Sequence, residues 1–143
     1  MKVSILSSNS ESLSELDLPL SSQHIHAGFP SPATDHIEQS LDLNKALIRH
    51  PSATFFLRVE GESMSGAGVN SGDILIVDRS IDPYNNAVVV CFLDGEFFLK
   101  RLEINEGKII LHAENSEYSS IEITDSHTLE IWGVVTYSIK KHI

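Results

Sequence analysis

The sequence predicts a mostly β fold: residues 51–143 form a domain of short, largely antiparallel strands, preceded by a flexible N-terminal arm and a short helical connector. Seven runs rich in β-branched and aromatic residues follow residue 51, and Gly, Asn, Asp or Pro separates them. Asp94-Gly95 stands between two of these runs and suits a two-residue type I′ turn, so a hairpin is expected there. The runs are TFFLRVE (54–60), DILIVD (73–78), AVVVCFL (87–93), EFFLKRLE (96–103), KIILH (108–112), SIEI (120–123) and TLEIWGVVTYSIK (128–140).

Residues 1–27 are predicted to form the flexible arm. They are rich in Ser, and their leucines are spaced too irregularly to define one face of a helix. The stretch has one Lys and no long apolar core, so it does not have the pattern of a secretion signal. No later run reaches the roughly 18 apolar residues of a membrane-spanning helix, and a cytoplasmic location is therefore expected.

Residues 28–50 are predicted to connect the arm to the β-rich domain. A glycine and two prolines at the start favour an extended path, after which one or two short helices are expected between residues 35 and 48. Asp35 with Glu38 three positions later resembles a capping box, and Asp42 is a candidate cap for a second helical turn. Pro51 is expected to end the helical stretch.

An excess of acidic residues argues against direct binding to nucleic acid. The chain has 143 residues, with 20 acidic and 10 basic side chains and a formal net charge of -10. Phosphate backbones attract clustered Lys and Arg, so any connection to DNA is expected to run through a partner. The single cysteine, Cys91, lies in the apolar run AVVVCFL and is expected to be a buried structural thiol. Without a disulfide framework, the chain suits a reducing compartment.

Ser63 is the first candidate for a functional residue, because it lies in the glycine-containing stretch GESMSGAG between two predicted strands. A serine hydroxyl needs a base to act as a nucleophile. The chain has seven histidines, and none lies in a local signature, such as G-x-S-x-G, that would pair it with Ser63. His24 and His26 alternate as a candidate metal pair, but the sequence offers no third ligand.

A lysine in its neutral form is the alternative base. In EFFLKRLE, strand alternation places Lys100 on one face with Phe98 and Leu102, and Arg101 on the other face. Both faces are largely apolar, so the pattern does not choose between the two cations. Arg keeps its proton in proteins, whereas a desolvated Lys can lose it. Lys100 is therefore the candidate base, and a strand lysine that only shields apolar neighbours is the alternative.

Six stretches carry a resemblance to a known family: AGFPSPATD, GESM, SGDILIVD, DGEFFLKRL, AENSEYSSIEI and IWGVV. In this order and spacing they resemble the UmuD branch of the LexA-like self-cleaving serine peptidases, from about residue 26 to the end. The resemblance implies a LexA-like peptidase domain with a Ser-Lys dyad, in which Ser63 is the nucleophile and Lys100 the base. It also implies self-cleavage between Ala27 and Gly28. Neither a cofactor nor a metal is expected.

The implied mechanism is acyl transfer to serine followed by hydrolysis. Neutral Lys100 takes the proton of Ser63, whose oxygen attacks the carbonyl carbon of Ala27. The backbone N–H groups of Glu62 and Ser63 are expected to hold the developing oxyanion.

Local features agree with these assignments. Gly28 has no side chain to obstruct approach to the Ala27 carbonyl, and Gly61 allows a close approach of the chain beside the nucleophile. Ser65 is an alternative nucleophile in the same turn, at the less well matched position. Met64 is expected to be a buried residue beneath the turn.

The resemblance further implies an accessory subunit of an error-prone translesion DNA polymerase in the SOS DNA-damage response. A RecA filament on single-stranded DNA would promote the self-cleavage, and the product of residues 28–143 would join a UmuC-like polymerase subunit as a homodimer. The part before Gly28 is too short for the helix-turn-helix domain of a LexA-like repressor. Signal peptidases share Ser-Lys chemistry but need a membrane anchor, and the apolar runs of this sequence are too short to predict one. The alternative is an uncleaved accessory or regulatory binding module without peptidase activity.

Overall fold

The computed structural model describes residues 2–8, 15–21, 25, 27–28 and 38–143. The chain divides into two compact units, the first made of residues 1–11 and 50–143 and the second of residues 12–49. The first unit contains the β-rich domain and the first strand of the arm. The second unit contains the rest of the arm and the connector.

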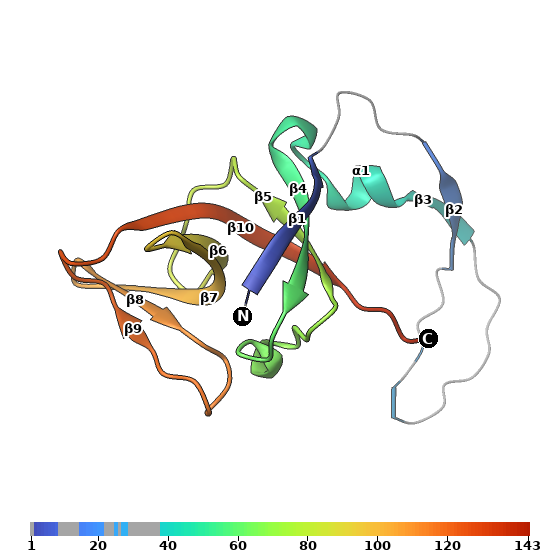
Figure 1. The fold of residues 1–143 in the computed structure, drawn as a ribbon. Helices are drawn as coiled ribbons and strands as arrows, with labels where there is room; N and C mark the ends of the chain where they lie inside the picture. Colours follow the sequence, from blue (N-terminus) through green and yellow to red (C-terminus); the bar gives the residue numbers. More distant parts are fainter. Residues whose placement is uncertain (1, 9–14, 22–24, 26, 29–37) are drawn as a thin grey trace. The chain divides into compact units, whose positions relative to one another are not determined.

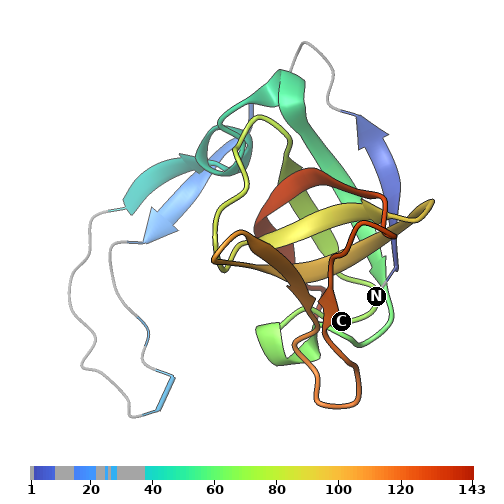
Figure 2. The same cartoon turned by 90° about the vertical axis from the view of Figure 1, so that its left-hand side faces the viewer.

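The first unit is built on one sheet of eight strands in the order β1-β4-β5-β10-β6-β7-β8-β9 (Figure 1). Every neighbouring pair is antiparallel, which confirms the predicted mostly β fold. The sheet is strongly curved, as Figure 2 shows. Its strands are β1 (Lys2–Ser8), β4 (Thr54–Glu60), β5 (Ile74–Asp78), β6 (Val88–Leu93), β7 (Glu96–Asn105), β8 (Lys108–His112), β9 (Ile121–Glu122) and β10 (Leu129–Ile139), with 3₁₀ helices η1 (Pro51–Ala53) and η2 (Ser65–Ala67).

All seven predicted strands are present. β4 and β8 have the predicted bounds, and the others are shorter or longer by one or two residues at an end. Asp94 and Gly95 have φ angles of 48° and 90°, the positive values that a type I′ turn requires. The predicted hairpin of β6 and β7 is therefore confirmed.

β1 was not predicted from the sequence. It forms one edge of the sheet, where Lys2 lies opposite Glu60 and Val3 opposite Val59 of β4. Val3 is buried in the core together with Leu57 and Val59. The stretch is short and rich in Ser, so its pairing with β4 rather than its own composition determines that it is a strand.

Two clusters of buried apolar residues stabilise the first unit, and β7 contributes to both. Leu99 belongs to the first cluster and Leu102 to the second, with Phe98 packed against the second, as strand alternation predicts. The first cluster contains Val3, Leu57, Val59, Met64, Val69, Leu75, Val77, Val90 and Leu99, and the second contains Ala87, Val89, Cys91, Leu93, Leu102, Leu111 and Val134.

In the second unit, β2 (Asp17–Ser21) pairs with β3 (Glu38–Asp42) as an antiparallel hairpin, and α1 (Leu43–Leu47) follows. Asp42 caps α1 as predicted, because its Oδ1 accepts a 3.0 Å hydrogen bond from the N–H of Asn44. The helix expected from the Asp35 and Glu38 pair is wrong at Glu38–Asp42, because these residues pair with β2 as a strand; Asp35 lies outside the described residues. The expectation for Pro51 is also wrong, because α1 ends at Leu47 and Pro51 begins η1. Within the part of the chain that the structure describes, no helix is long and apolar enough to cross a membrane.

Candidate active site

Ser63 lies in the turn that joins β4 to β5, just before η2. Gly61 begins this turn with a φ of 97°, a left-handed conformation that glycine adopts without strain. The Ser63 side chain is fully buried, and its Oγ has no hydrogen-bond partner among the described residues. Met64 is also fully buried and lies in the first core cluster, which confirms its predicted position.

The turn is attached to the segment that follows β8. The carbonyl oxygen of Ser63 accepts a 2.8 Å hydrogen bond from the N–H of Glu114, and the N–H of Gly66 donates a 2.7 Å hydrogen bond to the Glu114 carbonyl. A Cβ atom at residue 66 would lie 2.3 Å from that carbonyl oxygen, so glycine is required for this approach. Asn115 Nδ2 donates to the carbonyl oxygen of Glu62 at 2.8 Å.

Lys100 is buried on β7 and is 6% exposed. Within the described residues it forms no ion pair, and its Nζ lies 5.9 Å from the centre of the Phe98 ring. Burial disfavours the ammonium form and lowers the pKa of Lys100 from its ordinary value of 10.5. The side chain thus has the environment that a lysine base requires.

Arg101 has a different environment from Lys100. Its guanidinium pairs with the carboxylate of Glu114 and donates a 2.6 Å hydrogen bond to the carbonyl oxygen of Asn86. The choice between the two cations, which alternation left open, is therefore supported by packing: Arg101 is ion-paired and partly exposed, whereas Lys100 is buried without a counter-charge among the described residues.

Two connections link the turn of Ser63 to β7. Met64 and Leu99 belong to the same core cluster, and Glu114 contacts Ser63 through its backbone and Arg101 through its side chain. Among the described residues, no hydrogen bond connects Ser63 Oγ with Lys100 Nζ. The catalytic assignment of both residues therefore stays a prediction.

Three histidines are held by other groups. His50 Nδ1 contacts Asp78 at 2.6 Å, His127 Nδ1 accepts from the N–H of Thr124, and His112 is bound between Glu103 and Ser120. None of these hydrogen bonds reaches Ser63. The candidate metal pair His24 and His26 lies outside the described residues, which contain no group of side chains suited to a metal.

Cys91 is fully buried on β6. Burial raises the pKa of its thiol to about 11, and its Sγ donates to the carbonyl oxygen of Phe98 at 3.6 Å. A thiol held in its neutral form is a poor nucleophile, so the prediction of a structural cysteine is confirmed.

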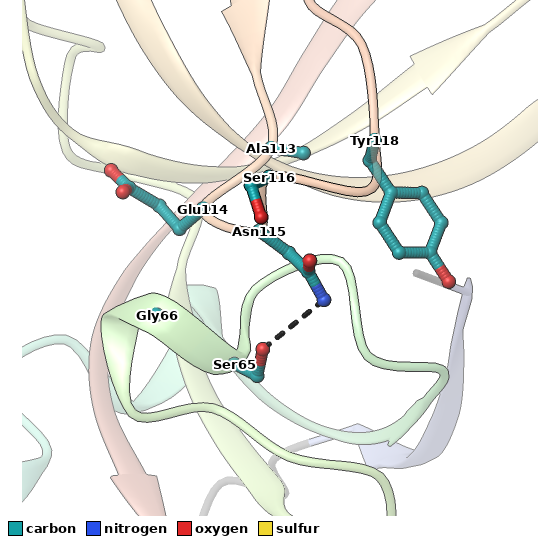
Figure 3. Close-up of a pocket in the computed structure, with 7 residues that line it drawn as sticks. All are labelled: Ser65, Gly66, Ala113, Glu114, Asn115, Ser116 and Tyr118. Atoms are coloured by element: carbon teal, nitrogen blue, oxygen red, sulfur yellow. Dashed lines mark hydrogen bonds between the residues drawn. The ribbon is translucent and has the colours of Figure 1, made fainter.

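A cavity of ≈ 570 Å³ opens beside η2 (Figure 3). Ser65 lies on its wall, and the Ser65 hydroxyl accepts a 3.3 Å hydrogen bond from Asn115 Nδ2. Glu114 and Asn115 belong to the stretch AENSEYSSIEI, and no local pattern in the sequence indicates that Asn115 contacts a turn 50 positions away. The cavity is lined by Ser65, Gly66, Ala113, Glu114, Asn115, Ser116 and Tyr118.

Ala27 and Gly28 are exposed residues of the second unit, in a bend outside its strands and helix. A Cβ atom at residue 28 would meet no atom within 4 Å. The peptide bond between them thus joins two exposed residues.

The sequence of this chain is similar to those of several known proteins. Residues 19–136 match the peptidase S24-like family. The protein MucA of Salmonella typhimurium is 41% identical over 143 residues, which cover 99% of this chain and 97% of MucA. The protein ImpA of Shigella flexneri is 44% identical over 86% of this chain and 83% of its own length. The protein SamA of Salmonella typhimurium is 43% identical over 86% of this chain and 85% of SamA.

Proposed function

Because this chain belongs to the UmuD-like branch of the LexA-like, peptidase S24-like family, we propose that it is a serine endopeptidase that cuts its own chain between Ala27 and Gly28. Ser63 is the nucleophile and Lys100 the general base. The observation that carries this proposal is the buried Lys100, which has a lowered pKa and no ion pair within the described residues.

The reaction begins with neutral Lys100 accepting the proton of Ser63. The Oγ attacks the carbonyl carbon of Ala27, and the oxyanion receives hydrogen bonds from the backbone N–H groups of Glu62 and Ser63. Among the described residues, neither N–H donates a hydrogen bond to another group. Collapse of the intermediate breaks the bond to Gly28, whose leaving nitrogen takes the proton from Lys100. Water then hydrolyses the acyl-enzyme and regenerates Ser63.

Assembly of the dyad is a natural point of control. Ser63 Oγ is buried without a partner among the described residues, and an unsatisfied buried hydroxyl costs roughly 1–3 kcal/mol. A hydrogen bond from Ser63 to Lys100 recovers part of this cost. We expect a RecA filament on single-stranded DNA to favour the arrangement in which the dyad is joined and the Ala27 carbonyl lies at Ser63.

Self-cleavage would separate β1 from the rest of the chain. Within the intact protein β1 is covalently attached and fills one edge of the sheet beside β4. After cleavage its binding becomes intermolecular, and its effective concentration falls from the millimolar range of a tethered segment. Residues 28–143 would then expose the β4 edge and, as a homodimer, join a UmuC-like translesion polymerase subunit in the SOS response.

Incubation of the purified chain at raised pH tests the peptidase assignment. Wild-type protein is expected to yield two fragments, because deprotonation of Lys100 activates Ser63, and an activated RecA filament should give the same fragments at neutral pH. The Ser63→Ala variant should stay intact in both conditions. Intact wild-type protein under both conditions would favour the second candidate, an accessory binding module of the same fold without peptidase activity.

A further inference from the structure

We propose that Asn115 is a positioning residue for the oxyanion site. This proposal rests on the self-cleavage proposed above. The side-chain amide of Asn115 holds the peptide unit between Glu62 and Ser63 through the 2.8 Å hydrogen bond from Nδ2 to the Glu62 carbonyl oxygen, which also accepts a longer, 3.2 Å hydrogen bond from the N–H of Ser65. A peptide unit is planar, with its C=O and N–H pointing in opposite directions. A donor that holds the Glu62 oxygen therefore also determines the direction of the Ser63 N–H, one of the two oxyanion donors.

The neighbouring peptide unit is held from the same segment. The carbonyl oxygen of Ser63 accepts its hydrogen bond from the backbone N–H of Glu114, the residue before Asn115. Both peptide units of the nucleophile are thus bound by two consecutive residues. The Glu114 contact uses only backbone atoms, whereas the Asn115 contact depends on the side chain and can be removed by substitution.

The Asn115 side chain is itself held in one orientation. Its Oδ1 accepts a 3.0 Å hydrogen bond from the N–H of Glu117, and its Nδ2 also donates to Ser65 Oγ at 3.3 Å, as Figure 3 shows. These partners place the acceptor toward Glu117 and the donor toward the Glu62 carbonyl. The reversed amide would place Oδ1 against the Glu62 carbonyl oxygen and Nδ2 against the N–H of Glu117, so the orientation is chemically defined.

The expected effect of the substitutions on the cleavage rate follows from the contribution that one oxyanion donor makes to the rate of acyl transfer. Removal of one such donor slows acyl transfer by about a hundred- to a thousandfold. Loss of the Asn115 contact leaves the Glu62 carbonyl with only the longer hydrogen bond from Ser65, so the Ser63 N–H is held less firmly but not removed, and we expect cleavage to slow by roughly ten- to a hundredfold. Asn115→Asp should be the more damaging change, because a carboxylate oxygen would face the Glu62 carbonyl oxygen.

The test compares Asn115→Ala and Asn115→Asp with wild-type protein across pH. Both variants should show a lower maximal cleavage rate, and Asn115→Ala should keep the midpoint of the pH profile, because it adds no charge near Lys100. Asn105→Asp, an exposed substitution at the end of β7 with the same change of charge, is the matched control and should cleave at the wild-type rate. A shifted midpoint in Asn115→Ala would mean that the substitution acts on Lys100. An unchanged rate in both variants would mean that the peptide unit needs no support from Asn115. Either result overturns the inference.

A second measurement separates this inference from the peptidase assignment. In uncleaved, isotope-labelled protein at neutral pH, the ¹⁵N resonance of Ser63 reports the hydrogen bond to the preceding carbonyl. It should move in both Asn115 variants and stay in place in Asn105→Asp. A Ser63 resonance that is unchanged in the Asn115 variants refutes the positioning role, whether or not the chain cleaves itself. Absence of cleavage in wild-type protein with a shifted resonance in the variants refutes only the peptidase assignment.

Discussion

The backbone carbonyl of Ser63 accepts a 2.8 Å hydrogen bond from the N–H of Glu114, and the side chain of the same glutamate pairs with Arg101. Arg101 directly follows Lys100 on β7. One residue therefore contacts both the turn of the proposed nucleophile and the strand of the proposed base. Displacement of Glu114 should disturb the relative positions of Ser63 and Lys100, the two proposed catalytic residues.

Gly66→Ala should displace Glu114 from the turn. The added Cβ would lie 2.3 Å from the Glu114 carbonyl oxygen, which must move, and overpacking of this kind typically costs about 1–3 kcal/mol. We expect a lower melting temperature and a cleavage rate reduced at least tenfold. Thermal unfolding and fragment analysis measure the two effects. Wild-type values for both would show that the close approach at Gly66 is not needed.

Lys100→Arg should abolish cleavage at every pH, because Arg keeps its proton. The wild-type rate should rise with pH to a plateau, with a midpoint below 10.5, since burial lowers the pKa of Lys100. Lys100→Ala should also be inactive, with a loss on the order of the hundred- to ten-thousandfold typical of a general base. Cleavage by Lys100→Arg would rule out the general-base assignment.

Lys100→Met should stabilise the fold at neutral pH. The pKa of Lys100 in the folded state lies below its unfolded value of 10.5, so below pH 10.5 folding must either bury the ammonium or remove its proton, and both cost free energy. Between the folded pKa and 10.5 the unfolded chain binds more protons, and wild-type stability rises with pH. The gain in melting temperature for Lys100→Met should therefore shrink as the pH approaches 10.5. A gain independent of pH would contradict the lowered pKa.

Gly28→Val should block cleavage, although Gly28 lies in open space in the folded chain. A β-branched side chain next to the scissile carbonyl would crowd the attack of Ser63 on Ala27. Wild-type processing should release a fragment of residues 1–27, which mass spectrometry identifies. Another terminus, or normal processing of Gly28→Val, would place the scissile bond elsewhere.

A disulfide between β1 and β4 should retain the arm after cleavage. Lys2 and Glu60 are exposed and directly opposite each other, and the native Cys91 is buried, so Lys2→Cys with Glu60→Cys should form one cross-link. The cleaved product should keep its N-terminal fragment until a reductant is added, and should bind a UmuC-like subunit more tightly afterwards. Lys2→Cys with Asn105→Cys is the control. Equal cross-linking in both pairs would contradict the β1–β4 register.

The sequence by itself determined the strands of the β-rich domain, the Asp94-Gly95 turn and the cap at Asp42. These features depend on local preferences: β-branched runs, a dipeptide that accepts positive φ angles and a carboxylate at a helix start. It also identified Ser63 and Lys100 as candidates, since their chemistry and the family motifs are visible in the sequence.

The tertiary structure alone decided the rest. Alternation places Lys100 and Arg101 on opposite faces of β7 but does not indicate that Glu114 pairs with Arg101 and leaves Lys100 buried without a counter-charge among the described residues. β1 is a strand because β4 provides its hydrogen-bonding partners, and Asn115 contacts the turn of Ser63 only because the chain returns there 50 positions later. Such contacts depend on the packing of distant segments, for which local sequence patterns carry no information.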